Sequence, residues 1–338
     1  MSVSGPIDVV VVGGYLGAGK TTLVNHLLRE GTGRRTLVLV NDFGSVAVDD
    51  ALVDSRDGDV LTLANGCVCC GMSSPLVEML VQIRDEGLGG GPELVVVETS
   101  GVADPETVAR HAMIPGFRRD GVVVMVDAET VRRRAADPIV GRSIERQLRA
   151  AELLVLNKVD LVDRATLAAV RDFVAGRAPR AGIVETSRGE VPVALLTGRS
   201  SAGKKAERAS HASAPVDAGP TGRHDGSDHD AWSWRGGVLD RAGVLDFVEA
   251  LPEGAVRAKG VLALADAPDR ATILQAVGRR HELIAGRAWE GDPPSSRLVV
   301  IGLRGSLDGD ALDAGIASSV AGPRSRERDR EDTTRSRP

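Results

Sequence analysis

The chain has 338 residues, and 42 lysines and arginines against 47 aspartates and glutamates give it a formal net charge of −5. This balance argues against non-specific nucleic-acid binding, which requires a basic surface. No apolar run approaches the roughly 18 residues of a membrane span. The N-terminal apolar run is short and has no basic segment before it, unlike a secretory signal. We therefore predict a cytoplasmic protein whose partners are neither nucleic acids nor membranes.

Short β-branched runs alternate with segments of helical periodicity as far as Leu196. Strands are expected at Ile7–Val12, Thr36–Val40, Leu94–Val97, Val122–Val126 and Leu153–Leu156. Helices are expected at Thr21–Arg29, Ser74–Glu86, Ser143–Ala151 and Arg164–Ala175. This alternation is typical of an α/β fold in which helices cover both faces of a mostly parallel sheet.

The pattern changes after residue 197. Residues 198–230 are rich in small and polar residues, which predicts a flexible linker between a first domain at 5–197 and a second at 231–320. In the second domain, strands are expected at Gly260–Asp266, Thr272–Val277 and Arg297–Gly302, and helices at Val244–Ala250 and Asp308–Val320. The second domain is therefore expected to be a smaller α+β unit. Residues 321–338 mix both charge signs and are predicted to be a disordered tail.

The segment GYLGAGKT, residues 14–21, matches the G-x-x-x-x-G-K-[ST] phosphate-binding loop between an expected strand and an expected helix. Glycines let backbone N–H groups approach the phosphates, the lysine supplies a cation, and the threonine hydroxyl suits a Mg²⁺ ion. The alternative is a glycine-rich turn with an incidental lysine. The residues expected to bind the phosphates are Gly14, Gly17, Ala18, Gly19, Lys20, Thr21 (also the Mg²⁺ ligand) and Thr22.

A second motif, N-K-x-D, follows the expected strand at Leu153–Leu156 and comprises Asn157, Lys158 and Asp160. A carboxylate at Asp160 can accept hydrogen bonds from both the ring N–H and the amino group of guanine, and adenine offers no such pair of donors. The Lys158 side chain can lie along the base plane. The motif therefore favours GTP as the nucleotide, although Asp160 as a plain helix cap is the alternative.

The segment VVVETSGVADP places Glu98 at the end of a buried strand and Gly101 in the loop that follows. Ligands of open α/β sheets bind at the carboxyl ends of the strands. Glu98 is expected to hold a Mg²⁺-bound water, and the Gly101 N–H to reach the γ-phosphate. We therefore predict GTP hydrolysis involving Lys20, Glu98 and Gly101, with slow intrinsic turnover because no water-orienting glutamine or arginine finger is evident.

All three cysteines of the chain, Cys67, Cys69 and Cys70, lie in one short segment, NGCVCC. An odd number of thiols in a reducing compartment favours metal binding or redox chemistry over disulfides. Thiolates suit Zn²⁺ or another thiophilic ion. Three thiolates, with the fourth position left to Asp42 or to a substrate, make an open site that can release its ion. Buried small hydrophobes and a redox pair are the alternatives.

Five motifs in this order resemble the CobW family of P-loop GTPases, which is related to HypB and UreG: GGYLGAGKTTLVNHLL, NDFGSVAVD, LANGCVCC, ETSGVADP and LNKVDLV. The segments VRAKG and RLVVIG resemble the family's C-terminal domain. The resemblance implies a GTP-dependent metallochaperone, most often for zinc and in some branches for cobalt or iron enzymes, with Cys-x-Cys-Cys as the metal site. The chain departs from the family at Asp42, which replaces a longer glutamate, and at Ser45, which replaces a second carboxylate.

We therefore predict a GTPase that uses GTP and Mg²⁺, binds Zn²⁺, Co²⁺ or another transition metal, and delivers it to a client metalloprotein. Two alternatives belong to other classes. The first is a metal-responsive GTP-binding interaction protein without turnover. The second is a P-loop kinase for small molecules, which the N-K-x-D motif and the lack of a basic lid disfavour. The client stays unidentified, and the sequence leaves open whether the chain forms a homo-oligomer.

Overall fold

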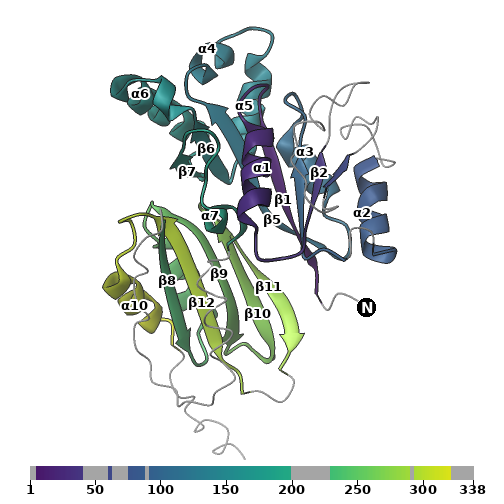
Figure 1. Cartoon of the computed structure of the whole chain (residues 1–338). Coiled ribbons are helices and arrows are strands. Elements are labelled where there is room, and N and C mark those ends of the chain that lie inside the picture. Colours follow the sequence, from purple (N-terminus) through teal and green to yellow (C-terminus); the bar gives the residue numbers. More distant parts are fainter. Residues whose placement is uncertain are drawn as a thin grey trace, which may run out of the picture.

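The computed structural model describes residues 5–40, 60–62, 75–87, 91–198, 229–289 and 293–320, and for residues 60–62 it describes the backbone alone. Two sheets organise these residues, one above the other in Figure 1, with the short helix α7 (Val193–Thr197) at their junction. Asp42 and the three cysteines lie outside the described residues.

The first sheet has seven strands in the order β3-β2-β4-β1-β5-β6-β7, and all neighbours pair in parallel. Nearly every residue of its central strands is buried, as expected of a sheet covered on both faces. The strands are β1 Ile7–Gly14, β2 Thr36–Val40, β3 Val60–Thr62, β4 Leu94–Glu98, β5 Phe117–Asp127, β6 Leu153–Asn157 and β7 Gly182–Glu185.

Alternate residues of β1 point to opposite faces of this sheet, so Val9 and Val11 enter one core and Val10 and Val12 another. Apolar residues of α2, α3, α5 and α6 complete the first core, and those of α1 and α7 pack in the second. The further helices are α1 Lys20–Glu30, α2 Pro75–Asp85, α3 Pro105–His111, α4 Val131–Ala135, α5 Gly141–Ala150, α6 Arg164–Ala175 and the 3₁₀ turn η3 Val159–Leu161.

The second sheet is antiparallel, with five strands in the order β11-β10-β9-β12-β8. Two helices cover one of its faces, and Trp232 and Phe247 meet in that core with ring centroids 5.9 Å apart. The elements are β8 His229–Gly236, α9 Arg241–Glu249, β9 Ala255–Leu264, β10 Ala267–Val277, β11 Arg280–Ala288, β12 Ser296–Leu303 and α10 Gly309–Ala317.

The predicted fold class is confirmed: a mostly parallel α/β sheet with a smaller α+β unit after it. The strands β3, β7, β8 and β11 were not expected. Each of them is an edge strand of its sheet, and Trp232 is the one buried residue of β8. β8 begins at His229, inside the segment 198–230 expected to be a linker, and the Asp230 carboxylate there accepts a hydrogen bond from Leu307 N.

β5 is longer than expected, because it begins at Phe117 rather than Val122. Its first half carries Arg118, Arg119 and Asp120, which do not read as a buried strand. These side chains meet charges of opposite sign instead of apolar neighbours, and part of that charge comes from the second sheet. Polar residues on a buried strand thus mark the place where the two sheets meet.

Apolar contact joins the two sheets. Val256 of β9, Val277 of β10 and Ile301 of β12 belong to the same buried core as Leu195 and Leu196 of α7. The α1 and α7 face of the first sheet is therefore also the face on which the second sheet packs.

A buried ionic cluster reinforces this junction. The Asp120 carboxylate, with no exposed side-chain surface, lies 2.6 Å from Lys259 Nζ, 2.5 Å from Arg257 Nη2 and 3.4 Å from Arg34 Nη2. Asp8 Oδ2 lies 2.7 Å from Arg34 Nη1. Asp8 and Asp120 belong to the first sheet and Arg257 and Lys259 to the second, so the charges compensate each other across the junction.

We expect Asp120→Asn to lower the free energy of unfolding by about 3–5 kcal/mol, because it leaves the buried Arg257 guanidinium without its carboxylate. Urea unfolding measures this loss. The control is Asp266→Asn, which removes an ion pair to Arg241 whose side chains are 52% and 40% exposed, and a loss below about 1 kcal/mol is expected there. Equal losses in the two variants would contradict a special role for the buried cluster.

The difference in unfolding free energy between the wild type and Asp120→Asn should also depend on pH. Burial alone would raise the pKa of Asp120, but Arg257, Lys259 and Arg34 outweigh it and hold that pKa well below its ordinary value. Because the folded-state pKa lies below the unfolded one, the carboxylate's contribution is complete above the unfolded pKa of about 3.9 and is lost as the pH falls below it. The difference in stability between the wild type and Asp120→Asn should therefore narrow below about pH 4.

Candidate functional site

The loop between β1 and α1 is built around close backbone approaches. A Cβ atom at Gly14 would lie 2.4 Å from the Met125 carbonyl oxygen, and one at Gly19 would lie 2.3 Å from Asn157 Nδ2. Both glycines also have positive φ angles, 133° and 102°, which side chains rarely adopt. The loop therefore fits against β5 and β6 only because these positions are glycine.

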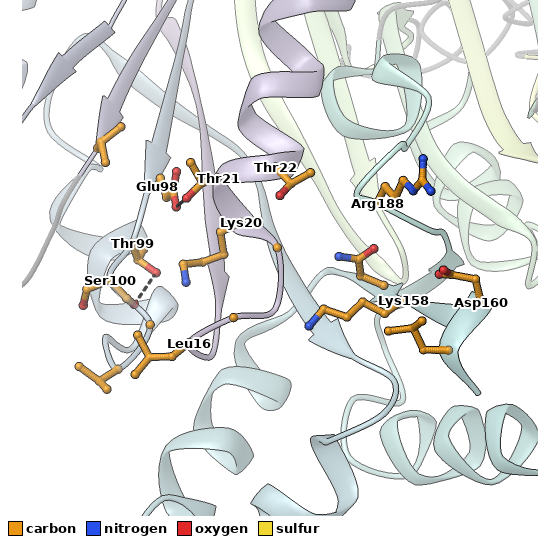
Figure 2. A pocket seen from close by; sticks show the side chains of 17 residues that line it. Leu16, Lys20, Thr21, Thr22, Glu98, Thr99, Ser100, Lys158, Asp160 and Arg188 are labelled. Atoms are coloured by element: carbon orange, nitrogen blue, oxygen red, sulfur yellow. Dashed lines mark hydrogen bonds between the residues drawn. The ribbon is translucent and has the colours of Figure 1, made fainter. Parts of the chain in front are cut away.

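A cavity of about 900 Å³ opens at the carboxyl edge of the first sheet, where this loop, β4 and β6 end. Figure 2 shows Lys20, Thr21 and Glu98 toward one side of it, and Lys158, Asp160 and Arg188 toward the other. The residues that line it are Leu16, Gly17, Gly19, Lys20, Thr21, Thr22, Val40, Glu98, Thr99, Ser100, Gly101, Val102, Asn157, Lys158, Asp160, Leu161 and Arg188.

On the first side, the Thr21 hydroxyl donates a hydrogen bond of 2.8 Å to Glu98 Oε1. Glu98 is 3% exposed, and its strand register places it opposite Val12 of β1 and Val40 of β2. The hydroxyl and the carboxylate present two oxygen atoms side by side, which is the donor chemistry that Mg²⁺ prefers. These residues fit a divalent cation held beside the amine of Lys20.

On the second side, Asn157 is a positioning residue that joins two loops. Its amide nitrogen donates to the Ala18 carbonyl oxygen at 2.9 Å, and its amide oxygen accepts from Gly189 N at 2.9 Å. Both polar atoms of the side chain are thus engaged by protein. Asn157 therefore acts on a ligand through the two loops that it connects.

Lys158 has a left-handed backbone, with φ of 64°, and its amine lies 2.9 Å from Asp127 Oδ2. Burial alone would raise the pKa of Asp127, but the hydrogen bond and charge of Lys158 hold that pKa below its ordinary value. The ion pair fixes the lysine chain along the cavity wall, and the exposed Asp160 follows in η3.

Of the residues predicted from the sequence, Gly14 and Ala18 lie behind the cavity wall, and the other phosphate-loop and N-K-x-D residues line the cavity together with Glu98 and Gly101. The predicted metal ligands Asp42, Cys67, Cys69 and Cys70 are outside the described residues, so their positions stay predictions. Within the parts of the chain that the structure describes, no group of three or more His, Cys, Asp or Glu side chains could hold a metal ion.

Arg188 is a site residue that the sequence analysis missed. It lines the cavity from the loop after β7, and its φ of 57° is unusual for a side-chain-bearing residue. The neighbouring Gly189, which is bonded to Asn157, fixes this loop. The glycine after an arginine was a weak signal, because only the tertiary contact with Asn157 brings this loop to the cavity.

We expect Asn157→Ala to weaken nucleoside triphosphate binding by roughly tenfold or more, because two buried hydrogen bonds that join the cavity loops are lost. Fluorescence titration with a labelled nucleotide measures the affinity. The control is Gln82→Ala, which removes an exposed amide on α2 and should leave the affinity unchanged. An unchanged affinity in Asn157→Ala would show that the two loops hold their positions without this bridge.

Comparisons with known proteins agree with this architecture. The family model described as CobW/HypB/UreG, nucleotide-binding domain matches residues 8–185, and the cobalamin synthesis protein cobW C-terminal domain matches residues 230–320. Among the helices described, none is long and apolar enough to cross a membrane.

Three relatives show the extent of the similarity. A protein named zinc chaperone CobW from Sinorhizobium sp is 32% identical, covering 94% of this chain and 98% of its own length. A protein of the same name from Pseudomonas aeruginosa is 33% identical, covering 93% of this chain and 92% of its own length. Zinc chaperone YjiA of Escherichia coli is 33% identical over 56% of this chain and 61% of its own. This chain belongs to the CobW/HypB/UreG family of nucleotide-binding proteins.

Proposed function

We propose that this chain is a GTP-hydrolysing metallochaperone that binds zinc through Cys67, Cys69 and Cys70 and passes it to a client metalloprotein. The observation that best supports the nucleotide part is that one cavity carries the Thr21–Glu98 pair on one side and Asp160 on the other. The residues suited to bind phosphates and those suited to bind a base thus lie on opposite sides of one cavity.

In this proposal, different residues bind the phosphates and the base of the nucleotide. The N–H groups of the phosphate loop and the Lys20 amine bind the β- and γ-phosphates. Asp160 accepts hydrogen bonds from the guanine N–H groups, while the aliphatic part of Lys158, held by Asp127, lies along the base. Leu161, which is 59% exposed beside Asp160, loses water when a base covers it.

Thr21 and Glu98 would hold Mg²⁺, which supplies positive charge against the phosphate oxygens when it is bound. Lys20 and the N–H groups of Gly101 and Val102 stabilise the charge that develops on the γ-phosphate. No glutamine is among the described residues that line the cavity. We therefore expect slow intrinsic turnover and propose that a client or the bound metal accelerates it.

The zinc part rests on the cysteine segment and on relatives that are named zinc chaperones. Val40, the last residue of β2, lines the cavity, and the chain continues directly from it to Asp42. A nucleotide that contacts this end of β2 is thus close along the chain to a proposed metal ligand, which offers a route for coupling. Free thiolates require a reducing compartment, consistent with a cytoplasmic location.

We expect Asp160→Asn to lower the affinity for GTP by about ten- to hundredfold, because a charged acceptor of two guanine hydrogen bonds is lost. The affinity for xanthosine triphosphate should rise, since its C2 carbonyl can accept from the new amide. Competition against a labelled nucleotide measures both. The control is Asp163→Asn, whose carboxylate caps α6 outside the cavity. Unchanged GTP affinity in Asp160→Asn would contradict guanine selection.

Zinc titration with and without a non-hydrolysable GTP analogue tests the metallochaperone directly. We expect different zinc affinities in the two states, because a ligand shifts only what it binds differentially. Cys69→Ser should lower zinc affinity by at least about tenfold while leaving GTP affinity nearly unchanged. Equal zinc affinities in both states would refute the coupling, and loss of GTP binding in Cys69→Ser would make the segment structural.

A further inference from the structure

Gln147 is a buried polar residue on the apolar face of α5, and the nucleotide chemistry described above does not use it. Its side chain is 2% exposed, and its helical neighbours Ile144 and Leu148 belong to the core of the first sheet. The amide nitrogen donates to the carbonyl oxygens of Gly101 and Ala103, both at 3.0 Å. Gln147 thus ties α5 to the loop that follows β4.

This loop is fixed at both ends by other contacts. Thr99 N donates to the Val12 carbonyl oxygen at 2.9 Å, and the Asp104 carboxylate caps α3 through Glu106 N at 3.1 Å. Between these ends, an Ala103–Ser100 backbone bond of 3.2 Å closes a turn. The two bonds from Gln147 are therefore what joins the middle of the loop to the core of the sheet.

The bond to the Gly101 carbonyl also determines which way the following N–H faces. In a planar trans peptide the N–H points opposite to the preceding carbonyl. With the Gly101 carbonyl turned toward α5, the Val102 N–H is directed away from α5, and Val102 lines the cavity. Among the described residues, the N–H groups of Gly101 and Val102 have no backbone acceptor. Gln147 therefore sets the direction of the Val102 N–H, and by holding the middle of the loop it keeps the adjacent Gly101 N–H in place.

The position of this loop is matched closely to the phosphate loop. A Cβ atom at Gly101 would lie 2.4 Å from Leu16 Cδ2 and 2.8 Å from Leu16 N. From the neighbouring helix α4, Arg134 Nη1 donates to the Leu16 carbonyl oxygen at 2.7 Å. The adjacent helices α4 and α5 thus hold the two loops that meet beside Lys20.

We propose that Gln147 is a positioning residue that allows the cavity to distinguish GTP from GDP. It does so by keeping the Gly101–Val102 donors directed at the place of the γ-phosphate, which GDP lacks. This inference rests on the proposed GTPase function and extends it to a residue that touches neither nucleotide nor metal.

The test is Gln147→Met, which keeps the length of the side chain but removes the donor. Both carbonyls then lose their buried partner, and the loop can turn. Affinity for a non-hydrolysable GTP analogue should fall by roughly tenfold, while that for GDP should stay within about twofold. The control is Gln275→Met, the same change at a buried glutamine on β10 outside the cavity, where the ratio of the two affinities should stay constant.

Gln147→Glu adds a readout that a merely structural role would not produce. The ionised carboxylate cannot donate to the two carbonyls, whereas the protonated acid can donate to one of them. Burial raises the pKa of such a carboxyl. Preference for the GTP analogue should therefore be lost near pH 8 and partly recovered toward pH 5.5 in Gln147→Glu, with no such recovery in Gln147→Met.

The outcomes separate the possibilities. If the ratio of the affinities for the GTP analogue and GDP stays unchanged in Gln147→Met, whether or not both affinities fall, the inference is overturned and Gln147 is a packing residue. Failure of the wild type to bind the GTP analogue would instead refute the proposed function. Urea unfolding of each variant shows whether it is folded, and Gln147→Glu at low pH keeps the test valid if Gln147→Met does not fold.

Discussion

The parallel hydrogen bonding of β4, β1, β5 and β6 is the constraint on which the site depends. Its register pairs Val12 with Glu98 and Asp127 with Asn157. Parallel strands end at one edge of a sheet, so residues from distant parts of the chain meet there without any contact between their side chains having to organise them. The Thr21–Glu98 bond and the Lys158–Asp127 pair follow from this register.

At the other end of these strands, on the α1 and α7 face, the first sheet contacts the second structural unit. Asp8 lies near the start of β1 and Asp120 in the first half of β5, and both meet cations beside the second sheet. A segment of about ten residues links the cavity to the second unit. At its start, Arg188 lines the cavity. At its end, the carbonyls of Leu196 and Thr197 accept hydrogen bonds from Arg257 and Lys259. The second unit therefore contacts the segment that carries Arg188 to the Asp160 side of the cavity.

The loop after β4 is where helix packing and nucleotide chemistry meet. In a protein whose proposed task is to change state with its nucleotide, a segment fixed at its ends and held in the middle by two hydrogen bonds is a suitable element to respond. Gln147, which is buried in the protein core, makes both of these hydrogen bonds to the loop. A change in the packing of α5 would therefore reach the Gly101 side of the cavity directly.

The sequence by itself determined the α/β class, the phosphate loop and the N-K-x-D segment, because β-branched runs, glycines and charged residues at fixed spacing act locally. Only the tertiary structure decided the surroundings of Arg188, Gln147 and Asp120. Each of them depends on a contact across the chain: Arg188 on the bond between Gly189 and Asn157, Gln147 on the carbonyl of Gly101, and Asp120 on Arg257. A buried polar residue interrupts the hydrophobic pattern of its helix or strand, and the sequence does not show which distant group it bonds. Tertiary packing determines that partner, and the spacing of residues along the chain does not.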